Sequence, residues 1–179
     1  MKTQAEKLKQ EGNEQVQVTH DYQRAVQSYT AAISIINTNY IYYNNRAAAF
    51  IFAGEYDKAI EDCNRSLALS AGNVRALSRK ATAEGECGCL EQAIVTIELA
   101  LATSPEDKQS LNVKSGLLAM RAQAEKLKEQ GSQQLKKHQD HTAAIKLFSE
   151  AISISKSNHG YYTHRAAAFI FGADLARAL

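Results

Sequence analysis

The sequence has one proline, three cysteines and no long hydrophobic run. A single proline and a near-balanced charge, 21 basic against 19 acidic residues, argue against disorder and against general affinity for nucleic acid. The longest uncharged apolar stretch, Ala47 to Ala53, is far too short to span a membrane. Three cysteines without framework spacing fit a reducing compartment, and Met1 runs into Lys2-Thr3-Gln4-Ala5-Glu6 without a secretory signal. We therefore expect a cytoplasmic protein.

A pattern of small and bulky residues recurs every 34 residues, which is the period of a helix-turn-helix repeat. In each copy two small residues lie seven positions apart with a bulkier apolar residue between them, which lets neighbouring helices approach closely. Gly54 and Gly88 share the same spacing and mark turns that need a positive φ. The three copies are Ala25-Tyr29-Ala32, Ala59-Cys63-Ser66 and Ala93-Ile97-Ala100.

These repeats resemble the tetratricopeptide repeat. In that family the small-bulky-small pattern is preceded by an aromatic residue or leucine, then by Gly or Ala, and then by Tyr or Phe. The matching positions are Leu8, Gly12, Ala25, Tyr29 and Ala32 in repeat 1, Tyr43, Ala47, Phe50, Ala59, Cys63 and Ser66 in repeat 2, and Leu77, Ala81, Ala93, Ile97 and Ala100 in repeat 3. The sequence departs from the pattern by lacking tryptophan and the proline that often closes repeats 1 and 2, and by one extra residue in the turn of repeat 1. The resemblance implies an all-α solenoid of antiparallel helix pairs.

A longer duplication overlies the repeats, because three segments return unchanged 119 residues later. They are Ala5-Glu6-Lys7-Leu8-Lys9, Ala32-Ile33-Ser34-Ile35 and Arg46-Ala47-Ala48-Ala49-Phe50-Ile51-Phe52. We predict a three-repeat array over residues 1–104, a capping or linker helix over 105–120, and a second array of about one and a half repeats over 121–179. Leu179 aligns with Ile60 inside a helix, so we expect the chain to be a piece of a longer protein.

The incomplete second array is expected to expose apolar side chains, at Phe169, Ile170, Phe171 and Leu175. Their counterparts in the first array, Phe50 to Phe52, are expected to be covered by neighbouring repeats. We therefore predict a homodimer through the C-terminal array, with a frayed C-terminal end as the alternative.

Helix boundaries follow from the apolar period and from the Gly and Asn residues between periodic segments. Ser104 is the expected N-cap of the capping helix, with Pro105 in its first turn. That helix either bends near Gly116 or continues into the second array. The other predicted helices span 2–16, 21–36, 39–53, 56–69, 73–87, 90–102, 120–137, 141–154 and 158–171.

Five polar residues are candidates for a binding site, because they fall on the first helix of each pair, which lines the concave groove in this architecture. They are Lys9, Asn13, Asn45, Arg75 and Arg79. Residues four apart share a helix face, so three cations and two carboxamides can point at one small volume. Such a cluster repels itself unless an anion occupies it.

The same five residues resemble the two-carboxylate clamp of chaperone-binding tetratricopeptide domains. The matching segments are Lys9-Gln10-Glu11-Gly12-Asn13, Asn45-Arg46-Ala47 and Arg75-Ala76-Leu77-Ser78-Arg79. The resemblance implies binding of the C-terminal carboxylate and the Asp side chain of a partner ending in Glu-Glu-Val-Asp, the tail of cytosolic heat-shock chaperones of the 70 or 90 kDa class. Arg75 stands where the family more often has Lys. Ala48 and Ile51 are candidates to floor a pocket for the partner's valine, with plain inter-helix packing as the alternative.

The second array does not keep this set, because Ser132 replaces Asn13 and His164 replaces Asn45. Cys87 and Cys89 flank a turn and lack the further ligands of a zinc site, so we predict no metal and no cofactor. No nucleophile is paired with a base, so we predict a binding adaptor, not an enzyme. The alternatives are a scaffold that binds another peptide, and the targeting region of a larger phosphatase or prolyl isomerase.

Overall fold

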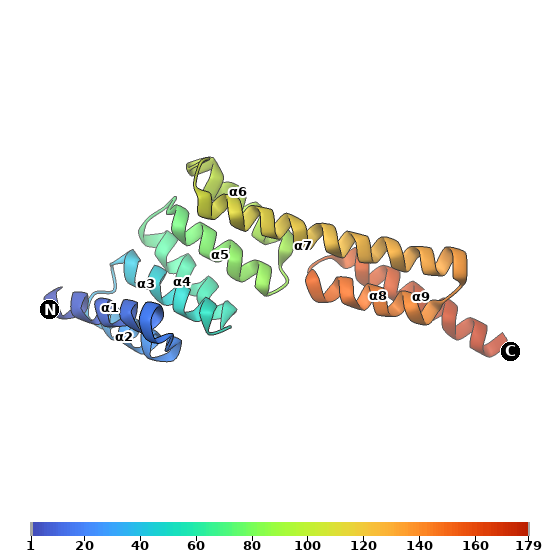
Figure 1. Cartoon of the computed structure of the whole chain (residues 1–179), viewed down its shortest axis with the longest axis horizontal. Coiled ribbons are helices and arrows are strands. Elements are labelled where there is room, and N and C mark those ends of the chain that lie inside the picture. Colours follow the sequence, from blue (N-terminus) through green and yellow to red (C-terminus); the bar gives the residue numbers. More distant parts are fainter. Residues whose placement is uncertain (1, 179) are drawn as a thin grey trace. The chain divides into compact units, whose positions relative to one another are not determined.

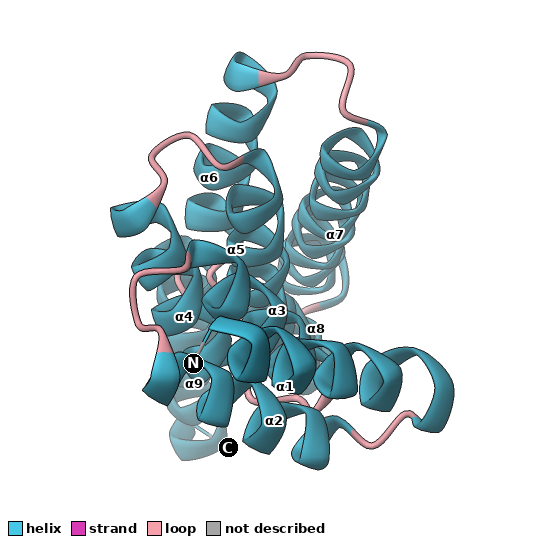
Figure 2. Cartoon of the chain, turned by 90° about the vertical axis from the view of Figure 1, so that its left-hand side faces the viewer, coloured by secondary structure: helices cyan, strands magenta, loops and turns pink. Residues whose placement is uncertain are grey.

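The computed structural model describes the backbone of residues 2–178, and the side chains of these residues except 137–138 and 174–178. All secondary structure in this described part is helical, with short connecting loops (Figure 2). The α-helices are α1 (Lys2–Glu14), α2 (Tyr22–Ile35), α3 (Tyr40–Phe52), α4 (Tyr56–Leu69), α5 (Val74–Glu86), α6 (Leu90–Thr103), α7 (Lys108–Gln133), α8 (His141–Ile154) and α9 (His159–Ala178), and the π-helical turns are η1 (Gln15–Thr19) and η2 (Gln134–His138). Within these residues, no helix is both long and apolar enough to cross a membrane.

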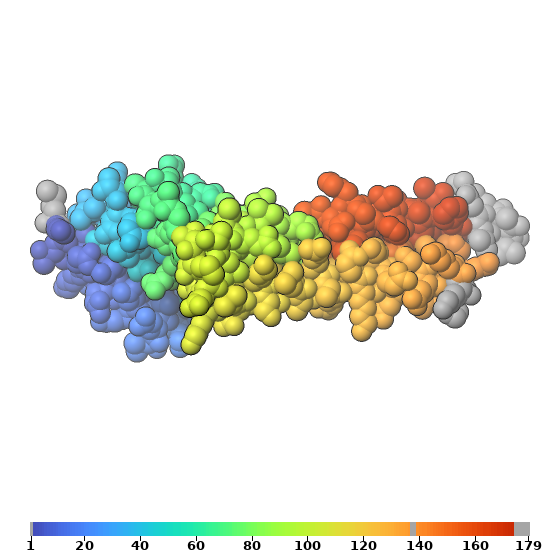
Figure 3. All heavy atoms as spheres, turned by 90° about the horizontal axis from the view of Figure 1, so that it is seen from above, coloured from blue at the N-terminus to red at the C-terminus, as the bar shows by residue number. Residues whose placement is uncertain are grey.

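The chain forms two compact units, one containing the residues up to Cys87 with Gln92–Lys114, and one containing Gly88–Glu91 with the residues from Ser115 on. In the first unit α1 packs on α2, α2 on α3, α3 on α4 and α4 on α5, as successive antiparallel neighbours (Figure 1). Helix α3 also contacts α5, so first helices of neighbouring pairs lie together. Within this unit the segments follow one another in chain order, as Figure 3 shows. This is the predicted solenoid arrangement of helix pairs.

The small residues of the 34-residue register are buried, as predicted. Ala25, Ala59 and Ala93 are fully buried, and the bulky residue between the small ones is at most 2% exposed in each copy. The ring of Tyr29 packs against Ala25. A Cβ at Gly12 would lie 2.6 Å from Cε1 of that ring, so glycine at this position is what lets α1 approach α2.

The turns between helices carry the expected residues. Gly54 and Gly88 have φ of +76° and +83°, which confirms the predicted left-handed turn positions. Asn39 and Asn73, also 34 residues apart, cap α3 and α5 with their side chains. Each side chain accepts a hydrogen bond from a backbone N–H of the first turn, which satisfies a donor that the helix itself leaves unpaired.

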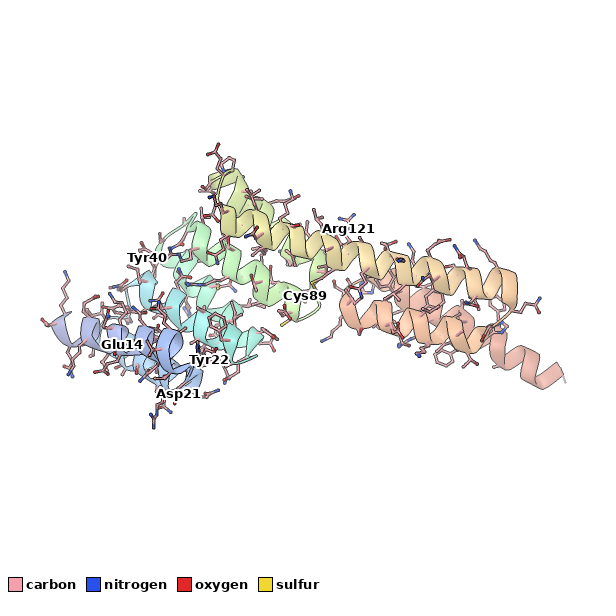
Figure 4. All side chains as sticks on the ribbon, viewed as in Figure 1. Glu14, Asp21, Tyr22, Tyr40, Cys89 and Arg121 are labelled. Carbon is pink, nitrogen blue, oxygen red and sulfur yellow. The ribbon has the colours of Figure 1, made fainter. Side chains whose placement is uncertain are left out.

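The extra residue of repeat 1 is accommodated by the π-helical turn η1, since a π-turn absorbs one residue more than an α-helical one. The turn ends at His20 with φ of +53°, and Asp21 then caps α2 by accepting from the Arg24 N–H. Figure 4 shows Glu14, Asp21 and Tyr22, which flank this turn. The duplicate turn η2 ends in the same way, at Gln139 with φ of +51°.

The capping helix begins later than predicted. Asp107, not Ser104, caps α7, because its carboxylate accepts from the Ser110 N–H at 2.8 Å and from the Ser110 hydroxyl at 2.7 Å. Pro105 instead lies in a turn closed by a bond of 3.2 Å from the Asp107 N–H to the Ser104 carbonyl. Helix α7 continues through Gly116 to Gln133, so the capping helix runs on into the first helix of the second array, which was one of the two predicted alternatives.

The second unit repeats the core of the first. Phe148 packs with Ala144 and Ala168, as Tyr29 packs with Ala25 and Ala49 119 residues earlier. Helix α9 was expected to end near residue 171 but runs to Ala178. At the position of the turn glycine Gly54 this array has Ala173, which favours continuing the helix.

The exposed apolar residues of α9 follow the prediction only in part. Phe169, Ile170 and Phe171 are 55%, 61% and 59% exposed, and the side chain of Leu175 lies outside the described residues. In the first unit Phe50 is 8% exposed, but Phe52 is 58% exposed, so the expectation that this whole stretch is covered there is wrong. The Phe169 position loses most of its cover between the two arrays, and Ile170 is also more exposed than its partly buried counterpart Ile51.

Candidate functional site

A pocket of about 410 Å³ lies in the first unit, between side chains from α1, η1, α2, α3 and α5. Its polar lining consists of carboxamides, two guanidinium groups and a phenol, and none of these described lining residues is acidic. The lining residues are Asn13, Val16, Gln17, Tyr29, Asn45, Ala48, Phe52, Arg75 and Arg79.

Four of the five predicted polar residues therefore line one pocket, and Ala48 lines it with them. Lys9 does not line it, and its ammonium instead pairs with the Glu6 carboxylate at 2.5 Å. Glu6 also accepts from the Tyr42 hydroxyl at 2.7 Å, and these two bonds lower the pKa of the Glu6 carboxyl.

Ile51 also lies away from the pocket, in the packing around Phe50 and Ala59, which corresponds to the alternative of inter-helix packing. The helical period explains this. Six residues after Asn45 a side chain points to another face of α3, whereas Phe52, seven residues after, returns to the face of Asn45 and Ala48. The apolar side of the pocket is thus formed by Ala48 and Phe52.

The two asparagines are connected through one oxygen. Oδ1 of Asn13 accepts from the Tyr29 hydroxyl at 2.8 Å and from Nδ2 of Asn45 at 3.2 Å. Because both neighbours donate to this oxygen, the orientation of the Asn13 carboxamide is defined. Its Nδ2 is left as a donor that forms no bond with another described residue.

The two arginines lie one turn apart on α5. Arg79 is half-buried and donates from Nη1 to the Asn44 carbonyl at 2.7 Å, and Arg75 is exposed. Burial, with a smaller contribution from the Arg75 charge, lowers the pKa of Arg79 to about 10, so it is still charged at neutral pH. Neither guanidinium forms an ion pair with a carboxylate of the described residues. The pocket therefore holds two positive charges and several donors without an anion.

Sequence reasoning missed four lining residues: Val16, Gln17, Tyr29 and Phe52. Val16 and Gln17 follow Asn13 by three and four positions, a spacing that places them on its face, but η1 is what carries them to the rim. Tyr29 was assigned to the core, and it is only 2% exposed. Phe52 stacks on Tyr22 with ring centroids 5.2 Å apart, which orders the rim of the pocket.

Arg46, which follows Asn45 in the sequence, belongs to a different contact. Its Nε and Nη2 donate to the two oxygens of Asp62 at 2.7 and 2.8 Å, and this pairing raises the pKa of Arg46. This bidentate ion pair links α3 to α4.

The second unit carries a different set at the equivalent positions. Lys128 pairs with Glu125, and Glu125 accepts from the Tyr161 hydroxyl at 2.7 Å, as in the first unit. However, the Ser132 hydroxyl donates to the carbonyl of Lys128 in its own helix, at 3.0 Å. His164 contacts the Gly160 carbonyl through Nδ1 at 2.6 Å. No carboxamide pair is formed here among the described side chains.

Similarity to known proteins agrees with this architecture. A tetratricopeptide repeat profile matches residues 40–73. The chain is 39% identical over 93 residues to small glutamine-rich tetratricopeptide repeat-containing protein 2 of Saccharomyces cerevisiae, covering 52% of this chain and 27% of that protein. It is 32% identical over 176 residues to Hsp70-Hsp90 organizing protein 1 of Arabidopsis thaliana, covering 83% of this chain and 30% of that protein.

Among solved structures, the second TPR domain of human RPAP3, in complex with the HSP70 peptide SGPTIEEVD, superposes with a TM-score of 0.61 at 30% identity, covering 64% of this chain and 95% of that one. The helix pairs and these matches define a tetratricopeptide-repeat protein, and the chain belongs to that family. Within the family it is related to Hsp70/Hsp90-binding co-chaperones. The chain spans under a third of the length of the curated relatives that it matches.

Proposed function

We propose that this chain is a co-chaperone-type adaptor that binds the acidic C-terminal tail, Glu-Glu-Val-Asp, of a cytosolic heat-shock chaperone of the 70 or 90 kDa class. The observation that supports the proposal is the pocket of the first unit, where two arginines and two asparagines from three helices meet and none of the described lining residues is acidic. The similar RPAP3 domain supports the proposal, because its structure was solved in complex with an HSP70 peptide that ends in Glu-Glu-Val-Asp.

The chemistry of such a tail matches the lining. A chain ending in aspartate carries two carboxylates within a few ångströms, one on the main chain and one on the side chain. Arg75 and Arg79 provide charged donors, and Asn13 and Asn45 provide amide donors. The penultimate valine would pack against Ala48.

In the proposed complex Lys9 contacts the peptide only if its ammonium leaves Glu6 for a carboxylate of the peptide. Its ammonium is bound to Glu6, one helical turn from Asn13, and a long flexible side chain can reach a second anion from there. Binding would then exchange one carboxylate partner for another, so we expect Lys9 to contribute less affinity than either arginine. The chain acts in this proposal by binding and not by catalysis.

Calorimetric titration with the free-acid peptide SGPTIEEVD tests the proposal. Each charge-assisted bond contributes about 1.5–3 kcal/mol, so Arg79→Ala and Arg75→Ala should each weaken binding roughly tenfold or more. Arg24→Ala is the matched control, because Arg24 is an exposed arginine that pairs with Asp21 at 3.4 Å outside the pocket. If both pocket variants fold and bind as tightly as the control variant, the clamp is excluded.

A further inference from the structure

The hydroxyl group of Tyr29 is not required by the packing of its ring. The ring lies in the core of the first unit against Ala25 and Ala49, next to Gly12. Burial of an aromatic ring accounts for the position of the side chain in the fold. The phenol oxygen instead donates to Oδ1 of Asn13, a residue of the pocket, at 2.8 Å.

The second unit provides an internal comparison for this hydroxyl. At the equivalent position Phe148 is fully buried against Ala144 and Ala168. A Cβ at Gly131 would lie 2.7 Å from its ring, as a Cβ at Gly12 would lie 2.6 Å from the ring of Tyr29. The two rings therefore have the same packing, and the fold accepts phenylalanine in this place.

The partner of the hydroxyl changes together with it. Ser132 stands where the first array has Asn13, and it bonds to a carbonyl of its own helix. His164 stands where the first array has Asn45. The phenol thus occurs in the array that has the two carboxamides and is absent from the array that lacks them.

The contact has a defined effect on Asn13. Two donors, Tyr29 and Asn45, converge on Oδ1, so a flipped amide would place its NH₂ group against both of them. Burial raises the pKa of Tyr29 to about 12, which keeps the phenol a donor at neutral pH. The Nδ2 group of Asn13 is then the end of the amide that faces away from both bonds and remains available to a ligand.

We propose that Tyr29 is a positioning residue of the anion site, whose hydroxyl holds the Asn13 carboxamide with Nδ2 presented to a carboxylate of the bound peptide. The proposal rests on the proposed binding of an acidic C-terminal tail. Tyr29 acts through Asn13, so its hydroxyl has no effect on affinity once Asn13 is gone. The ring of Tyr29 packs in the core of the first unit, and its hydroxyl positions the Asn13 carboxamide.

A double-mutant cycle with the peptide SGPTIEEVD tests this assignment. Loss of one hydrogen bond predicts that Tyr29→Phe weakens binding roughly threefold to tenfold. In the Asn13→Ala background the same change should leave affinity unchanged within about twofold. Phe148→Tyr is the matched control, since it adds a hydroxyl to the equivalent ring of the second unit, and it should leave affinity at the wild-type value.

The side-chain amide resonances of Asn13 provide a readout that a purely structural role would not move. In the unliganded protein Tyr29→Phe should shift these resonances while the backbone spectrum of α1 and α2 is retained. Unchanged Asn13 resonances with wild-type affinity in Tyr29→Phe would overturn the positioning role alone. An effect of the same size in the Asn13→Ala background would overturn it too, and would indicate a direct contact with the peptide. A wild-type chain that leaves the peptide unbound would overturn the proposed function and this inference together.

Discussion

Lys9 differs from the other polar candidates, because its ammonium already pairs with a carboxylate of the protein and needs no ligand. Its contact with Glu6, and that of Glu6 with Tyr42, recur in the second unit as Lys128, Glu125 and Tyr161. The second unit keeps this contact although it has lost both carboxamides. The contact therefore stabilises the packing of first helices in both arrays, whereas Asn13 and Asn45 are particular to the pocket.

Glu84 is the residue at which the repeat pattern is broken inside the core. It lies 34 residues after Phe50, in the position of an aromatic residue, and it is only 5% exposed. Its Oε2 has no hydrogen-bond partner among the described residues, and the Lys80 ammonium is 3.8 Å from Oε1. Burial raises the pKa of the Glu84 carboxyl.

Glu84→Gln should therefore stabilise the fold at neutral pH, by about 1 kcal/mol. A raised folded-state pKa means that the charged form costs stability as pH rises, and that this cost is absent below the unfolded-state pKa of about 4.3. The gain in Tm should be largest near neutral pH and shrink toward zero at about pH 4. Thermal melts of Glu86→Gln, which changes an exposed neighbour on α5, give the control. If Glu84→Gln raised the Tm equally near neutral pH and at about pH 4, the destabilising effect of the buried Glu84 carboxylate would be contradicted.

The features of the helices and turns that could be predicted from the sequence are those that depend on a local residue pattern. The buried alanine register and the positive φ of Gly54 follow from spacing and from backbone sterics. The start of α7 and the end of α9 do not, because several capping residues compete at the first and a glycine-to-alanine exchange removes the turn at the second. The position of η1 at the rim of the pocket depends on how the turn of repeat 1 accommodates its extra residue, and the repeat period does not determine this.

The pocket shows the same division. Convergence of Asn13, Asn45 and the two arginines follows from the repeat register, since each falls on the first helix of its pair. The pairing of Lys9 with Glu6 depends on the rotamer of the Lys9 side chain, which residue spacing cannot decide. Ile51 takes the alternative of inter-helix packing, whereas the helical period identifies Phe52 as the next residue on the pocket face of α3.

The approach of α1 to α2 can be tested at the glycine between them. A Cβ at Gly12 would lie 2.6 Å from the Tyr29 ring, so Gly12→Ala should destabilise the protein by about 1–3 kcal/mol. Gly116→Ala is the control, because outside the neighbouring backbone of its own helix no heavy atom lies within 4 Å of a Cβ at that position. It should stabilise by roughly 0.5–1 kcal/mol. Urea unfolding measures both, and a Gly12→Ala protein as stable as wild type would contradict the close approach.

Each of the two units has its own core of equivalent residues, and among the described residues the pocket lined by carboxamides and guanidinium groups belongs to the first unit. The second unit instead exposes an apolar position that the first one buries, since Phe169 is 55% exposed and its counterpart Phe50 is 8% exposed. Burying such a side chain is worth roughly 1.5–3 kcal/mol, so this surface favours association.

Light scattering should accordingly show concentration-dependent dimers, in line with the homodimer expected from the sequence. Phe169→Ser should shift the protein toward the monomer, because it removes the apolar contact without touching the core of the unit. Phe52→Ser, at a comparably exposed phenylalanine of the first unit, should leave association unchanged. A strictly monomeric wild-type protein would rule out this use of the surface.

The proposed function depends most directly on recognition of a free C-terminal carboxylate. Calorimetry with the peptide SGPTIEEVD as a free acid and as its C-terminal amide separates that recognition from general affinity for acidic peptides. We predict that one free-acid peptide binds per chain, that binding weakens with added salt as charges are screened over about 10 Å at 0.1 M, and that amidation lowers the affinity at least tenfold. Equal binding of the two peptides would contradict recognition of a free C-terminal carboxylate and would indicate a scaffold that recognises peptides in another way.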